Sequence, residues 1–111
     1  MEQLFNKMAE YVKMEEDLPF DEFQNYYNSV IDFLQKEYQN LSVEDLIKVK
    51  GIVRIMCANA RARALIKNDN RKKFIKIGEK TAFWDDAINR RLVKEEGMAA
   101  DEVQQKVDAL W

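Results

Sequence analysis

The sequence predicts an all-α protein, a single-domain helical bundle of four to five helices with a long central helix at about residues 43–67. Only three glycines and one proline interrupt a chain that is 47% hydrophobic and 34% charged, and this composition favours helices over strands joined by turns. Apolar residues recur at intervals of three and four, which is the period of an α-helix. A length of 111 residues suits one domain, so we expect residues 1–111 to share one core.

The first two helices are predicted on either side of Pro19, which disfavours helical geometry in the residue before it. Residues 1–17 carry apolar side chains at helical spacing, but Glu15 to Asp17 place negative charge where the dipole of a helix C-terminus opposes it. We therefore expect fraying there. A second helix is predicted for residues 21–38. Its expected core stripe comprises Phe23, Tyr27, Val30, Ile31, Leu34 and Tyr38.

Tyr26 and Phe33 lie off that stripe and, seven residues apart, share another face of the second helix. One interpretation is a contact surface for another protein. The alternative is that the helix has a single wide core face.

The central helix carries two apolar stripes, whereas a surface helix needs one. Ser42 is expected to cap its start, and Asn68 to Asn70 supply turn residues near its end. The first stripe, expected in the core, comprises Leu46, Val49, Val53, Met56, Cys57, Ala60 and Ala64. The second lies on the roughly opposite side and comprises Ile47, Gly51, Ile55, Ala58, Ala62 and Leu65. Two stripes indicate a helix packed between two layers, either within its own domain or between two subunits.

Residues 71–95 allow two interpretations. In the first, one helix runs throughout, because Phe74, Ile77, Trp84, Ile88 and Leu92 then share a stripe. In the second, a short extended piece ends at Gly78 and a helix begins near Thr81. The shared stripe favours the continuous helix, with Gly78 as the place for a kink. Gly97 is expected to end it, before a last helix at residues 101–111.

Charge is distributed unevenly along the chain, although the net charge is only −2. Residues 1–46 hold 11 acids and 3 bases, whereas residues 47–94 hold 4 acids and 14 bases. Residues 95–111 are again acidic, with 5 acids and 1 base. The candidate anion-binding or nucleic-acid-binding face comprises Arg61, Arg63, Lys67, Arg71, Lys72, Lys73, Lys76, Lys80, Arg90 and Lys94. One interpretation is contact with a nucleic-acid backbone. The other is that the acidic helices or the acidic tail screen this face.

Residues for catalysis are scarce. The chain has no histidine, its two serines lie outside nucleophile motifs, and its three glycines form no phosphate-binding loop. The single Cys57 lies on an apolar stripe and is expected to be a packed core thiol. We expect no catalytic residue, no cofactor and no metal, and therefore no enzyme. A carboxylate-metal enzyme is a third hypothesis, supported only by scattered acid pairs.

The resulting functional hypothesis is a small cytoplasmic protein that acts through protein contacts, as an adaptor, a regulator or an inhibitor. The doubled stripe indicates self-association as a homodimer, through the second stripe or through Tyr26 and Phe33. The alternative hypothesis is a nucleic-acid-binding protein that uses the basic segment 61–94. No membrane association is expected, because the chain lacks a long uncharged apolar run and an N-terminal signal pattern.

Overall fold

The computed structural model describes residues Met1–Trp111 and shows five α-helices without strands, which confirms the predicted all-α bundle. Their bounds are α1 Glu2–Tyr11, α2 Phe20–Glu37, α3 Val43–Ala64, α4 Arg71–Arg90 and α5 Ala100–Asp108. A short 3₁₀ turn, η1 Tyr38–Asn40, extends α2, and a π turn, η2 Arg91–Glu95, extends α4. None of the helices is long and apolar enough to cross a membrane.

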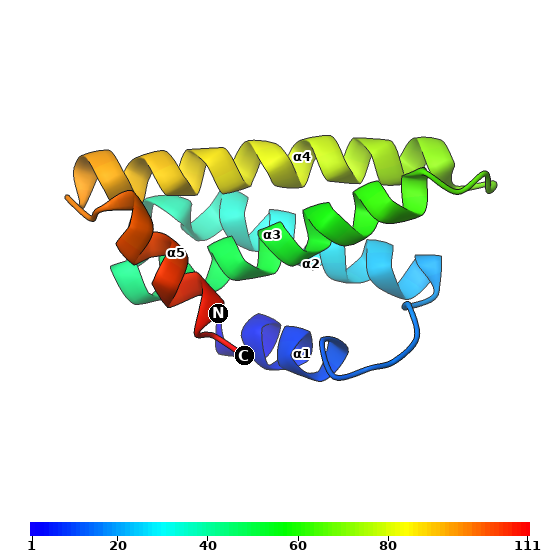
Figure 1. The fold of residues 1–111 in the computed structure, drawn as a ribbon, viewed down its shortest axis with the longest axis horizontal. Helices are drawn as coiled ribbons and strands as arrows, with labels where there is room; N and C mark the ends of the chain where they lie inside the picture. Colours follow the sequence, from blue (N-terminus) through cyan, green and yellow to red (C-terminus); the bar gives the residue numbers. More distant parts are fainter.

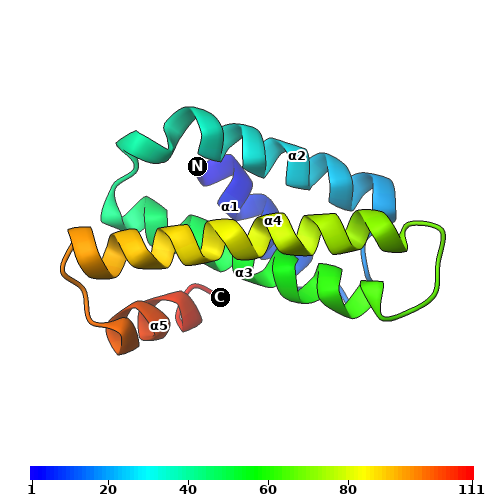
Figure 2. The same ribbon diagram turned by 90° about the horizontal axis from the view of Figure 1, so that it is seen from above.

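The long helix α3 lies at the centre, antiparallel to α4, and the two share the most extensive contact of the fold (Figures 1 and 2). The helices α4 and α1 lie at opposite edges of the molecule, with α3 between them (Figure 1). The last helix, α5, packs on α3 and returns the chain toward its N-terminus (Figure 1). This arrangement places α3 in contact with layers on both sides.

The start of α3 is the one that the sequence predicts. The Ser42 hydroxyl accepts a hydrogen bond from the backbone N–H of Asp45, at 3.2 Å, and so satisfies one free donor of the first turn. All seven residues of the first stripe are buried, which confirms them as core. Val49, Ile52 and Val53 have no exposed surface at all.

The end of α3 comes earlier than predicted, at Ala64 rather than near residue 67. Side chains of the following turn replace the helical hydrogen bonds there. The Asn68 amide donates to the carbonyls of Arg63 and Ile66, at 3.1 and 2.7 Å, and Arg71 Nε donates to the Ala64 carbonyl at 2.8 Å. These donors satisfy the last carbonyls, so the helix does not need another turn.

The helix α4 is continuous through Gly78, so the interpretation with a break is wrong. Gly78 is buried where α4 passes α3, and a Cβ atom there would lie 3.4 Å from Arg61 Cγ and 3.9 Å from Ala60 Cβ. At the far end, Gly97 has a φ of +70° and stops the chain from continuing as a helix, as expected.

The first helix is shorter than predicted, because α1 ends at Tyr11 and not at residue 17. No basic residue lies in its last turn, and Glu15 to Asp17 would have opposed the helix dipole had it continued. Residues 12–19 instead form a loop that crosses to α2. That loop lines a groove between α1, α2 and α3.

Candidate interaction surfaces

The second stripe of α3 divides into a covered half and an open half. Ile47 and Gly51 are buried, and the tail after α5 covers Gly51, where a Cβ atom would meet Leu110 and Trp111. Ile55 is half-buried, and everything beyond it faces outward. We call the outward half, together with the adjoining Ile66, the open stripe; it comprises Ile55, Ala58, Ala62, Leu65 and Ile66.

The open stripe ends in two strongly exposed aliphatic side chains. Leu65 is 85% exposed and Ile66 is 66% exposed, the highest values among the large apolar residues of the chain. Ala58 and Ala62, one and two turns earlier, are also exposed. Strongly exposed large aliphatic side chains beside small ones mark a surface that another apolar surface can cover.

The aromatic pair of α2 is not a contact surface, so that interpretation is wrong. Tyr26 is buried because α1 packs across it, and its hydroxyl donates a hydrogen bond of 2.7 Å to the Leu4 carbonyl. Its ring also meets Tyr11 edge to face, at 5.3 Å between centroids. Burial, with a smaller contribution from Tyr11, raises the pKa of Tyr26 above its ordinary value. Phe33 is half-buried and packs on the core. The helix therefore has the single wide core face of the alternative interpretation.

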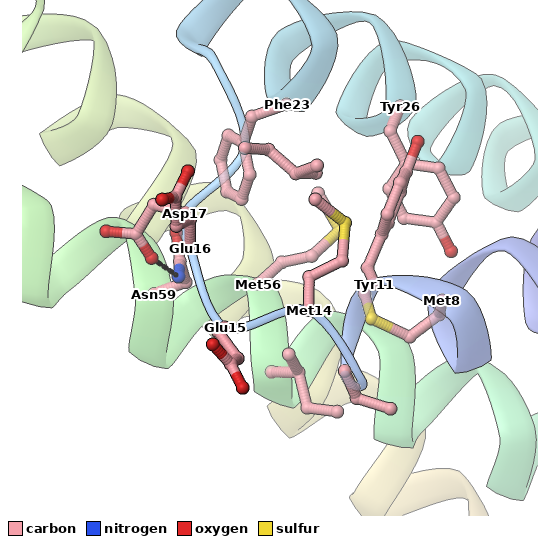
Figure 3. A pocket seen from close by; sticks show the side chains of 13 residues that line it. Met8, Tyr11, Met14, Glu15, Glu16, Asp17, Phe23, Tyr26, Met56 and Asn59 are labelled. Atoms are coloured by element: carbon pink, nitrogen blue, oxygen red, sulfur yellow. Dashed lines mark hydrogen bonds between the residues drawn. The ribbon is translucent and has the colours of Figure 1, made fainter.

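A groove of about 290 Å³, which sequence reasoning missed, opens between α1, the loop after it, α2 and α3. In Figure 3 the methionines Met14 and Met56 lie in its middle, with Phe23 on one side and Tyr11 on the other. Met14 is 49% exposed although it lies among apolar side chains. Methionine is flexible and polarisable, so such a lining adapts to different side chains. The only sequence signal was that Val12 and Met14 continue the apolar pattern beyond Tyr11.

One side of the groove is acidic. Glu15, Glu16 and Asp17 line it from the loop, and no basic residue takes part in the lining. Asn59 of α3 donates from Nδ2 to Asp17 Oδ1 at 3.3 Å (Figure 3). The other amide atom of Asn59, Oδ1, is buried and accepts no hydrogen bond. This edge therefore presents three carboxylates that form no ion pair.

A second depression, which we call the tail hollow, lies on the other side of Ile55 and also encloses about 290 Å³. It is lined by residues of α3, of α5 and of the C-terminal tail. Arg54 and Asp108 form an exposed ion pair at its edge, with 3.2 Å between Nη1 and Oδ1. Trp111 forms one wall and stacks on Phe5, with 5.0 Å between ring centroids. Ile55 thus stands between two depressions, the groove and the tail hollow.

The candidate basic face divides by how its side chains are used. Three of its ten residues are bound within the fold: Arg63 stacks on Phe74 at 4.4 Å, Lys73 lies over Phe20 at 5.3 Å, and Arg71 caps α3. The other seven are exposed and form no ion pair, so no acidic helix or tail covers them. They are Arg61, Lys67, Lys72, Lys76, Lys80, Arg90 and Lys94.

An aromatic ring lies on the outer face of α4 among these lysines. Phe83 is 56% exposed, and Lys80 Nζ lies 5.7 Å from its ring centroid. A base or another flat group could stack on such a ring, while nearby lysines neutralise a phosphate. Basic charge and aromatic surface are therefore together on this face.

The start of α4 is electrostatically unfavourable for the helix. Arg71, Lys72 and Lys73 occupy its first turn without an acid, and Asn70 provides no side-chain cap. The N-terminal end of a helix carries partial positive charge, so these three cations reduce helix stability. Arg71 compensates by capping α3, and Lys73 lies over Phe20, so Lys72 is the one of the three without a contact inside the fold.

No three residues among the histidine, cysteine, aspartate and glutamate types lie close enough together to hold a metal ion. Cys57 is buried, with Sγ 3.5 Å from the Gly78 carbonyl. No protein-family model, no curated protein and no solved structure matches this chain.

Proposed function

We propose that this protein acts through contacts with other proteins in the cytoplasm, as an adaptor, a regulator or an inhibitor, and that it self-associates through the open stripe. The observation that carries this proposal is the exposure of Leu65 and Ile66 at the end of an apolar surface on the central helix.

The spacing of the open stripe suits helix pairing. Ile55, Ala58, Ala62 and Leu65 follow one another at intervals of three, four and three, the spacing at which two packed helices meet. The two alanines in the middle allow close approach of the helices, and the larger residues stand at the ends. The stripe is about 15 Å long, so we expect a small interface and a dissociation constant in the micromolar range.

Sedimentation velocity over a protein concentration range tests this proposal. We expect a concentration-dependent dimer for the natural sequence and a monomer for the Ala62→Glu, Leu65→Glu double variant. Both positions are exposed, so circular dichroism and the melting temperature should change little. The Asn25→Glu, Asn28→Glu variant adds the same charge at exposed positions of α2 and should still dimerise. A natural protein that stays monomeric at every concentration would refute self-association.

A second candidate function is binding of nucleic acid on the outer face of α4. The specific observation in its favour is that Lys72, Lys76 and Lys80 are exposed and unpaired, beside an exposed phenylalanine. Each lysine that contacts a phosphate releases a counterion, which makes affinity depend strongly on salt. Overall acidity does not prevent this, because these lysines are exposed and form no ion pair with an acidic residue of the fold.

Titration of random-sequence duplex and single-stranded DNA at low salt tests the second candidate. Changing Lys72, Lys76 and Lys80 together to Glu should abolish binding. The matched control changes the exposed lysines Lys13, Lys36 and Lys106 to Glu, with the same net charge, and should retain most of it. Equal losses in the two variants would show that only net charge matters and would remove the case for a site on α4.

A further inference from the structure

We propose that two copies of the chain pair with their α3 helices antiparallel, so that Leu65 and Ile66 of each copy fill the groove and the tail hollow of the other. This inference rests on the proposed self-association and specifies its geometry. Ile55 separates the two depressions, and Leu65 and Ile66 are the two exposed side chains available to fill them. The ligand of this surface is therefore a second copy of the same surface.

The register follows from the spacing of the open stripe. When two antiparallel helices cross midway between Ala58 and Ala62, Ala58 of each copy faces Ala62 of the other. Residue 65 of one copy then faces residue 55 of the other, where both depressions open. The small residues thus meet at the centre, and the large exposed ones meet cavities, which is the complementarity that a closed two-fold interface requires.

The covered half of the second stripe selects the antiparallel orientation. Leu110 and Trp111 cover α3 at Gly51, so the tail protrudes at that end of the helix. In a parallel pair the two tails would meet at the same end and hold the open stripes apart. In an antiparallel pair each tail lies beyond the end of the other copy's α3, which stops at Ala64.

Charge favours the same arrangement. Lys67 directly follows Ile66, is exposed and forms no ion pair. When Ile66 enters the partner's groove, Lys67 reaches the edge formed by Glu15 and Glu16. The C-terminal end of α1, beside this edge, carries partial negative charge and has no basic residue in its last turn. Lys67 of the other copy therefore compensates the charge of Glu15 and Glu16 and the partial charge at the end of α1. The two-fold symmetry produces this contact twice.

Charge exchange between the two contact partners tests the geometry. A rim variant, Glu15→Lys with Glu16→Lys, and a tip variant, Lys67→Glu, each place like charges across the interface. We expect each to weaken dimerisation at least about tenfold, since two contacts are affected per dimer. A mixture of the two variants should form heterodimers with near-natural affinity, because opposite charges then face each other at both contacts.

Two further variants serve as controls. Glu95→Lys with Glu96→Lys matches the rim variant in charge, Lys94→Glu matches the tip variant, and neither should affect dimerisation. A mixture that fails to restore association, in a protein whose natural form dimerises through Ala62 and Leu65, would overturn this geometry while leaving self-association in place. A natural protein without any dimer would instead refute the proposed function itself.

Oxidative cross-linking tests the orientation independently. In a Cys57→Ala background, chains carrying Ala58→Cys are mixed with chains carrying Ala62→Cys. The antiparallel pair should yield disulfide-linked heterodimers, because position 58 faces position 62. Preferential cross-linking of each variant with itself would indicate parallel helices and would overturn the proposal.

Discussion

Lys50 on α3 and Asp85 on α4 form an ion pair at the contact between the two longest helices of the protein. The Lys50 side chain is only 9% exposed and that of Asp85 is 27% exposed, so this is the most buried ion pair of the fold. Apolar stripes alone allow neighbouring helices to slide by a turn. The buried ion pair forms in only one register of α3 against α4, and it therefore favours that register over the others.

Loss of this pair should destabilise the protein markedly. Changing Asp85 to Asn leaves the buried ammonium group of Lys50 without a counter-charge, and we expect a loss of about 2–3 kcal/mol in the free energy of unfolding. Urea denaturation followed by circular dichroism measures it. The neighbouring Asp86→Asn variant is a control, because Asp86 is exposed and unpaired and should change stability by less than about 0.5 kcal/mol. Equal effects of the two variants would contradict a special role for Asp85.

Two glycines should respond to alanine in opposite directions. Gly97 has a φ of +70°, where an alanine side chain is strained, so Gly97→Ala should lower the free energy of unfolding by about 1 kcal/mol. Gly78 lies inside α4, and an added Cβ there meets only the movable Arg61 side chain at 3.4 Å and Ala60 Cβ at 3.9 Å. Alanine should therefore raise stability at that site, by up to about 1 kcal/mol from helix propensity. A destabilised Gly78→Ala variant would show that the contact between α3 and α4 is tighter than these two distances indicate.

Stability should fall in alkaline solution because of Tyr26. Its pKa in the folded protein is raised above the ordinary value near 10, mainly by burial. The unfolded chain therefore loses this proton first, so the stabilisation is complete below about pH 10 and decreases as pH rises further. The slope from one such group is about 1.4 kcal/mol per pH unit. Urea denaturation at several pH values between 8 and 11 measures it.

The Tyr26→Phe variant separates this contribution from the others. It should be less stable at neutral pH by about 1 kcal/mol, since the Leu4 carbonyl loses its donor. Its alkaline slope should be shallower but not zero, because burial also raises the pKa of Tyr11 and Tyr27. An unchanged slope would assign the alkaline loss to those two tyrosines and to Lys48, whose pKa is raised by its hydrogen bond to Glu2.

Binding and stability should oppose each other at the start of α4. Lys72→Glu replaces a cation by an anion in the first turn, which should raise the free energy of unfolding by roughly 0.5–1 kcal/mol and weaken any binding of DNA. Lys94→Glu makes the same change in the last turn of η2, where the dipole has the opposite sign, and should lower stability. Urea denaturation of both variants measures the pair of effects. Stability changes of the same sign would show that the dipole does not govern these positions.

The elements that the sequence predicts well are those with a long regular pattern. The core stripe of α3 and the continuous α4 follow directly from helical periodicity, and the Ser42 cap follows from local chemistry. The end of α3 was less predictable, because it depends on hydrogen bonds from Asn68 and Arg71 that the pattern does not show.

The candidate surfaces were only partly predictable, because they depend on which segment covers which face. Periodicity placed Tyr26 outside the core stripe, but α1 folds over it and buries it. The groove needs an unwound loop after Tyr11, where the pattern indicated a longer helix. The exposure of Leu65 follows from the absence of any helix over the end of α3, which is a property of the whole arrangement and not of a local segment.

The tail residues Leu110 and Trp111 cover the surface of α3 at Gly51 and so end its exposed apolar strip there. They occupy the space beside Gly51 that a neighbouring helix would otherwise enter. Because Leu110 rests on a glycine and Trp111 is held by stacking on Phe5, small changes at these positions would move the boundary of the exposed apolar strip by a full helical turn. The length of the exposed apolar strip on the 22-residue helix α3 is thus set by two side chains that follow the C-terminal end of α5.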